Sequence, residues 1–126
     1  MNEELENRLK ELNVEEIIWG VYLIIIGLSF YSNQIERDYF LNKNEQSKRK
    51  YRELTITIFV LAILVYLYFV YDTYNDLKNL DINSNSKKVK FTYLNFIASA
   101  LILIAGIILL YIAISDKDLD IEIAFV

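Results

Sequence analysis

Three long uncharged segments dominate the pattern of apolar and polar positions along the chain. They occupy residues 17–35, 54–71 and 91–115, which are 19, 18 and 25 residues long. A helix needs about 20 mainly apolar residues to cross a bilayer, whereas a buried helix of a soluble bundle keeps a polar stripe. The stretches "ITIFVLAILVYLYFVY" and "IASALILIAGIILLYIAI" are apolar all round. The pattern therefore predicts an all-α membrane protein with three transmembrane helices.

Polar segments separate the three spans and extend their helices. The chain has no proline and three glycines, so helices are expected to break only at clusters rich in Asn and Ser, residues 42–47 and 81–88. The helices expected from this spacing cover residues 2–41, 45–80 and 86–115. A basic loop with helix extensions (residues 36–53) joins the first two spans, and a polar loop (residues 72–90) joins the second and third.

The segment before the first span, residues 1–16, is predicted to be an amphipathic helix. Leu5, Leu9 and Leu12 recur at helical spacing and form a narrow apolar seam. The seam either packs against the extension of the second helix or lies on lipid or a partner, and the acidic charge favours the first alternative. Glu15 and Glu16 stand where a cleavable signal peptide would carry basic residues, so the first span is expected to stay as an anchor.

The C-terminal tail, residues 116–126, alternates acidic and apolar residues. This period of two is typical of a β-strand, yet a lone strand is unstable in water. The tail is therefore expected to be disordered or to add to a sheet edge of a partner. The residues of this candidate docking tail are Leu119, Ile121, Ile123, Phe125 and Val126. A frayed, solvated terminus and a signal read by proteases are the alternatives.

Small and polar residues mark where helices can approach each other within the membrane. Those of the first span lie seven residues apart, and those of the third span form one stripe with the same step. A seven-residue step keeps one face toward a left-handed neighbour. We therefore predict that the first and third spans pack together, within one chain or between copies. The candidate packing residues are Gly20, Gly27, Thr92, Asn95, Ser99, Gly106 and Ala113.

The amino-acid composition excludes several kinds of catalytic and metal-binding site. Cysteine and histidine are both absent, which removes disulfides, thiolate nucleophiles, histidine bases and the usual zinc sites. The net charge of -4 offers no basic field for nucleic acid. No catalytic, cofactor-binding or metal-binding residue is assigned, because Asp72 and Asp76, one helical turn apart, fit a solvated helix end better than a cation site. The spans also lack the charged residues that transporters place at membrane depth.

These features favour a non-enzymatic accessory or adaptor subunit that assembles with partners in the membrane. The competing expectation is a homo-oligomeric pore former, as in three-span phage holins, although holins commonly end in a basic tail and this tail is acidic. Expected partners are the lipid bilayer and either further copies of the chain or another membrane protein, but not nucleic acid. Heavy use of Ile, Asn, Lys and Tyr points to an AT-rich bacterial genome, and hence to a bacterial plasma membrane.

The numbers of Lys and Arg on the two sides of the membrane are nearly equal, so they decide the orientation only weakly. The N-terminal segment and second loop hold six Lys and Arg, against seven in the first loop and tail. The dense "SKRKYR" beside the second span tips the expectation toward a cytoplasmic first loop (residues 36–53) and C-terminus.

Overall fold

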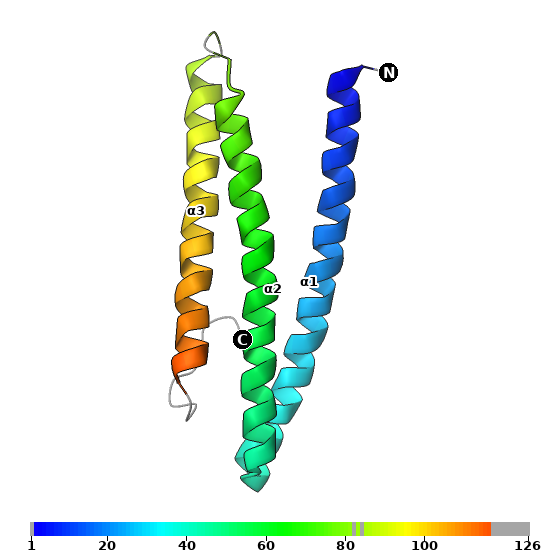
Figure 1. Ribbon diagram of the computed structural model, residues 1–126, viewed down its shortest axis with the longest axis vertical. Helices are drawn as coiled ribbons and strands as arrows, with labels where there is room; N and C mark the ends of the chain where they lie inside the picture. The colour runs from blue at the N-terminus through cyan, green and yellow to red at the C-terminus, as the bar shows by residue number, and fades with distance from the viewer. Residues whose placement is uncertain (1, 82, 84, 117–126) are drawn as a thin grey trace. The chain divides into compact units, whose positions relative to one another are not determined.

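The computed structural model describes residues 2–81, 83 and 85–116 (Figure 1). Within these residues lie three α-helices, α1 (Glu3–Asn42), α2 (Glu45–Lys78) and α3 (Ser86–Ser115), and no β-strand. The predicted all-α fold is confirmed, and all three helices are long and apolar enough to cross a membrane. The chain divides into two compact units, Met1–Leu54 and Thr55–Val126, and the division falls inside α2.

Asparagine side chains cap the N-termini of α1 and α3. The Asn2 side-chain oxygen accepts a hydrogen bond of 3.0 Å from the backbone N–H of Glu4, and that of Asn85 accepts one of 2.7 Å from Lys88. Each bond satisfies a backbone donor that has no partner within the helix. Polar caps of this kind replace proline and glycine as the signals that start the helices.

The turn between α1 and α2 is only two residues long. Lys43 adopts a left-handed backbone (φ 50°, ψ 40°), and its N–H donates to the carbonyl of Tyr39 at 2.7 Å. The side chain of Asn44 then accepts from the N–H of Gln46 at 3.0 Å, which starts α2. Because the break is so short, α1 and the first turns of α2 form an αα-hairpin.

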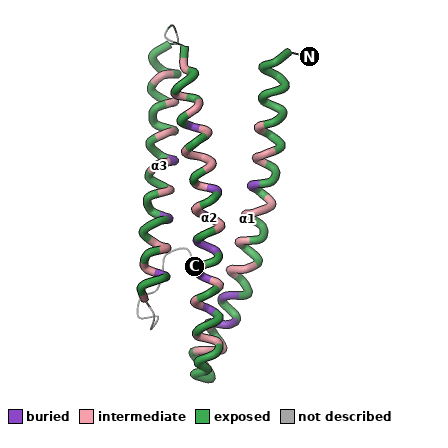
Figure 2. The backbone as a smooth tube through the Cα atoms, in the orientation of Figure 1, coloured by how far each residue is buried: buried purple, intermediate pink, exposed green. Residues whose placement is uncertain are grey.

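Thr55–Val126, the second unit, contains most of α2 together with α3, and these two helices lie side by side (Figure 1). Three residues of α3 are buried, Ser99, Gly106 and Ala113, each seven residues from the next (Figure 2). The rest of the helix is exposed or half-buried. The buried surface of α3 is therefore a single narrow stripe of small side chains.

Candidate functional site

α2 and α3 come into close contact at Gly106. A methyl group built on this glycine would lie 3.0 Å from Cδ2 and 3.1 Å from Cε2 of Tyr66, and 3.5 Å from Cγ1 of Ile63. Contacts near 3.0 Å are shorter than van der Waals distance, so the ring of Tyr66 occupies the space that a side chain would need. The missing side chain of Gly106 is what lets the Tyr66 ring lie against the backbone of α3.

A buried hydrogen bond joins the same two helices seven residues away along each of them. The hydroxyl oxygens of Thr73 and Ser99 lie 2.8 Å apart, and the residues are 6% and 8% exposed. Each hydroxyl also lies within 2.8 Å of a carbonyl of its own helix, that of Phe69 or Phe96. One hydroxyl thus donates to the other, which donates to its own backbone. The pair is satisfied without water, as a buried contact between two helices requires.

Both contacts follow one antiparallel register. On α2, Tyr66 and Thr73 are seven residues apart. On α3, their partners Gly106 and Ser99 are also seven residues apart. One further step of seven brings Phe59 of α2 level with Ala113 of α3, and both residues are buried. α2 thus supplies the larger side chains and α3 the smaller ones, in the repeat of a left-handed helix pair.

The other candidate packing residues of α3 lie outside this buried stripe. Thr92 is half-buried, and its hydroxyl donates to the carbonyl of Lys88 at 2.7 Å within the same helix. Asn95 is exposed. These two polar residues precede Ser99 and lie nearer the start of the helix than the contacts with α2.

The glycines of α1 have open surroundings. Among the described residues, no heavy atom would come within 4 Å of a methyl group built on Gly20 or Gly27. The predicted pairing of the first and third spans joins the two units, and it stays a prediction.

Large apolar side chains cover the remaining face of α3. Their exposed fractions are about half or more, which is unusual for a helix surrounded by water. The residues in the middle of the helix with this exposure are Ile97, Leu101, Ile102, Ile104, Ile107 and Ile108. Such a surface matches a hydrocarbon environment.

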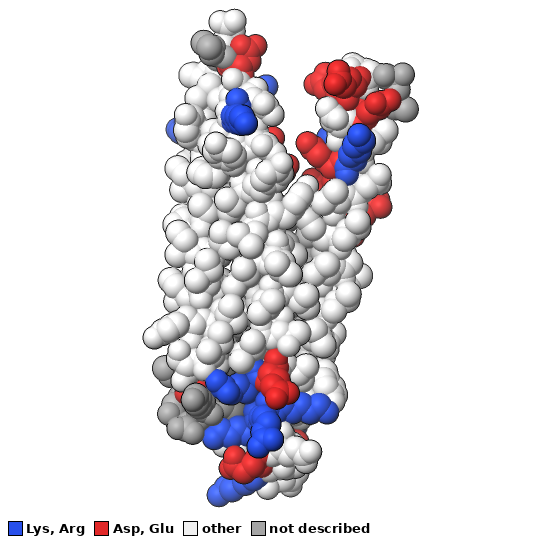
Figure 3. All heavy atoms as spheres, in the orientation of Figure 1, with Lys and Arg blue, Asp and Glu red and all other residues white. Residues whose placement is uncertain are grey.

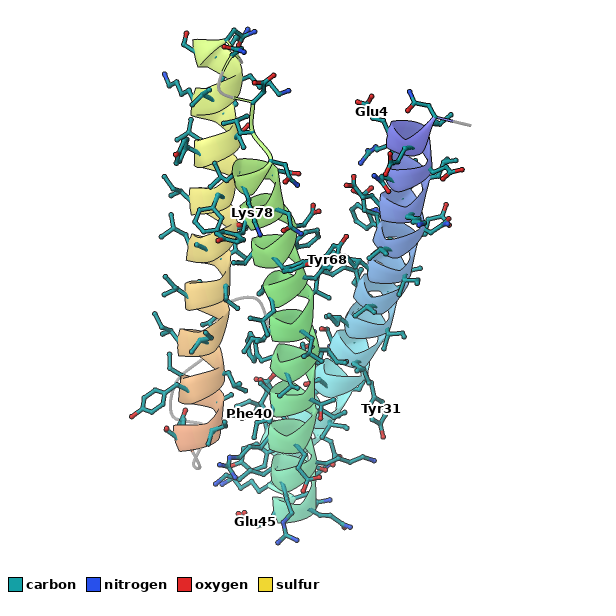
Figure 4. All side chains as sticks on the ribbon, turned by 45° about the horizontal axis from the view of Figure 1, so that its top comes forward. Glu4, Tyr31, Phe40, Glu45, Tyr68 and Lys78 are labelled. Atoms are coloured by element: carbon teal, nitrogen blue, oxygen red, sulfur yellow. The ribbon has the colours of Figure 1, made fainter. Side chains whose placement is uncertain are left out.

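The α1–α2 hairpin carries the densest group of basic residues in the described chain (Figure 3). Aromatic rings accompany the cations: Lys50 Nζ lies 5.1 Å from the centroid of Tyr31, and Lys48 Nζ lies 5.9 Å from that of Tyr39. Phe40 belongs to the last turn of α1, and Tyr31 lies further back on the same helix, away from Glu45 at the start of α2 (Figure 4). The hairpin thus combines cationic groups with rings that favour a membrane interface.

Asp38 holds the two arms of this hairpin together. Its carboxylate accepts hydrogen bonds of 2.5 Å from the Ser47 hydroxyl of α2 and of 2.6 Å from the Asn42 amide. These bonds, that from Ser47 above all, hold the pKa of Asp38 below its usual value of 3.8. Hydrogen bonds to the charged form explain the direction, because protonation would remove an acceptor.

The described residues contain no group of three or more Asp, Glu, His or Cys side chains placed to hold a metal ion. The candidate docking tail, Leu119, Ile121, Ile123, Phe125 and Val126, lies outside the described residues. The proposed docking function of the tail therefore depends on its sequence pattern alone.

The sequence pattern indicates the small residues of α3 but not their partners on α2. Thr73 lies beyond the uncharged run and Tyr66 belongs to a group of tyrosines, so each resembles a residue of the membrane border. The available signal was their spacing, because Phe59, Tyr66 and Thr73 repeat every seven residues, as the stripe of α3 does.

Comparison of the chain with known protein families, curated proteins and solved structures finds no match.

Proposed function

We propose that this chain is a three-span protein of a bacterial plasma membrane and serves there as a non-enzymatic accessory or adaptor subunit. Three helices of spanning length and the exposed aliphatic face of α3 support the membrane location. The absence of cysteine and histidine from the sequence supports a role in assembly rather than catalysis. The amino-acid usage supports a bacterial source.

The observation that carries this proposal is the contact between α2 and α3. A pore former needs polar or small residues to line a channel or to join copies around it. Here Ser99 and Gly106, at the centre of the stripe of α3, are already engaged by Thr73 and Tyr66 of the same chain. What remains outward on the middle of α3 is aliphatic, and such a surface suits lipid or the helix of a partner.

The tail provides the proposed means of docking. In this view Ile121, Ile123 and Phe125 form the apolar side of a strand that adds to a sheet edge of a partner. The full chain and a version ending at Ser115 should be purified from native membranes, and the proteins retained by each should be identified. A protein retained only by the full chain, and confirmed by reciprocal purification from the tagged partner, is the expected result.

A matched pair of variants separates strand docking from charge. Ile121→Asp with Ile123→Asp places acidic residues on the apolar side and should abolish retention. Asp120→Ser with Glu122→Ser changes two residues on the opposite side and should preserve it. If the full chain and the shortened chain yield only matching homo-oligomers, the adaptor proposal fails.

The pore alternative has its own test. The purified protein should leave a fluorescent dye inside vesicles of bacterial lipid, at protein densities where a known pore former releases it. Rapid release, with a conductance that changes when Asn95 is replaced by Leu, would establish a pore and overturn the adaptor proposal.

We also place the first loop and the C-terminus in the cytoplasm. Protease added outside intact cells should therefore leave a C-terminal tag uncut. Cleavage of that tag would reverse the orientation without affecting the adaptor role.

A further inference from the structure

We infer that the α1–α2 hairpin is a binding surface for the headgroups of anionic phospholipids. The inference does not depend on the adaptor role, because it concerns the lipid beside the protein rather than a protein partner. It starts from the distribution of charge. Residues 48–53 carry four basic side chains and one acidic side chain, a net charge of +3 over six residues.

One acidic residue of the hairpin, Asp38, is engaged by hydrogen bonds within it. Asp38 accepts hydrogen bonds from Ser47 and Asn42, so its charge serves to join the two helices. The bond from Ser47 also fixes the geometry of the hairpin, because it links the end of α1 to the first turn of α2. The basic side chains of α2 are therefore displayed on a defined support.

The basic residues of α2 lie at the depth of lipid phosphates. The apolar run of the second span begins at Leu54, and Arg52, Lys50 and Arg49 precede it by two, four and five residues. With a rise of 1.5 Å per residue, they lie about 3 to 8 Å beyond the hydrocarbon boundary. The headgroup layer on each side of a bilayer is about 5 to 8 Å thick. The three cations thus fall within this layer.

Aromatic contacts keep one of these cations at the boundary. Lys50 Nζ lies 5.1 Å from the centroid of the Tyr31 ring, and Tyr31 lies four residues before the end of the first apolar run. The ring holds the ammonium group close to the hydrocarbon edge instead of letting it extend into water. Arg49, on the neighbouring position, is exposed and offers a planar fork that matches phosphate oxygens.

The opposite end of α1 has the contrary character. Residues 2–16 carry six acidic and two basic side chains. Arg8 lies 3.1 Å from Glu11 and 3.7 Å from Glu15, so its charge is compensated locally. If α1 crosses the membrane, its two ends face different leaflets, and only the hairpin end suits a negatively charged one.

Thermal unfolding of the full-length protein in neutral detergent provides the test. Phosphatidylglycerol should raise the unfolding temperature, and phosphatidylcholine should have little effect. Arg49→Gln with Lys50→Gln should weaken the apparent affinity for phosphatidylglycerol roughly 30-fold, about five-fold for each cation near the membrane surface. Arg8→Gln with Lys10→Gln, which also removes one Arg and one Lys, should leave this affinity unchanged.

Two further measurements keep the outcome unambiguous. The exchange Arg49→Lys with Lys50→Arg preserves charge and should retain the response to phosphatidylglycerol, which separates lost binding from lost folding. Inorganic phosphate in excess should not reproduce the stabilisation, since a single free anion lacks the membrane anchor of the lipid. Stabilisation by inorganic phosphate, equal responses to the two lipids, or equal losses in the two double variants would each overturn the inference.

Discussion

Gly106 provides the most direct test of the helix contact. Replacement by leucine puts a Cβ atom 3.0 Å from the ring of Tyr66 and adds three further carbon atoms beyond it. Cγ1 of Ile63 lies 3.5 Å from the same position, so the added side chain meets α2 at two residues. Extra atoms in a packed region typically cost about 1–3 kcal/mol. The folding equilibrium constant should therefore fall roughly 5- to 150-fold.

The matched control is Gly27→Leu. Among the described residues nothing lies within 4 Å of a methyl group at Gly27, so leucine should be accommodated there. A stability loss at Gly27 would instead report the predicted contact with the third span. Both substitutions replace a helical glycine and gain the same helix propensity, about 0.8 kcal/mol. The difference between the two variants therefore isolates the packing term at Gly106.

Unfolding by sodium dodecyl sulfate in mixed micelles, followed by circular dichroism, gives the free-energy differences. A double-mutant cycle sharpens the result: Tyr66→Ala removes the ring, so the cost of Gly106→Leu should shrink when the two are combined. A Gly106→Leu variant as stable as the unchanged protein, or strict additivity of the cycle, would refute the reasoning.

Three further predictions follow from the structure. In a double-mutant cycle of Thr73→Val and Ser99→Ala, measured in the same micelles, the coupling energy should be about 0.6 kcal/mol and at most about 1.7 kcal/mol; a value of zero would contradict a shared hydrogen bond. Ser47→Ala should raise the pKa of Asp38 toward 3.8, measured by NMR titration of the carboxyl carbon. Because the folded pKa is lowered, the stability contributed by Asp38 is present above its unfolded pKa and is lost as the pH falls through the folded pKa. Ile104→Lys, in the middle of the exposed aliphatic face, should oppose membrane insertion by about 2.5–3.5 kcal/mol in a translocon assay; unchanged insertion would argue against a lipid-facing α3.

The amino-acid sequence was sufficient to predict the three helices, because each is specified locally. Apolar runs of spanning length, the absence of proline and the Asn-rich breaks act within single helices or turns. The observed α1 and α3 match the expected ranges to within a residue at each end. α2 ends at Lys78, two residues earlier than expected, since the backbone turns at Asn79 and Leu80.

The candidate packing residues show where local reasoning stops. The seven-residue step identified Ser99, Gly106 and Ala113 as one stripe, and these are the buried residues of α3. The step could not identify the helix that meets the stripe, because several apolar helices present a similar surface. Only the tertiary structure assigned Thr73 and Tyr66 as partners, since that assignment depends on a register between residues 26 to 40 positions apart.

The features of the α1–α2 hairpin likewise fall into those set by sequence and those set by tertiary structure. Sequence alone determined that basic residues gather between the first two spans, because charge is a property of composition. Tertiary structure decided that Asp38 joins the two helices through Ser47 and that Lys50 lies over Tyr31. These contacts require the chain to reverse at Lys43, and the distance between side chains on two helices follows from that turn rather than from any local pattern.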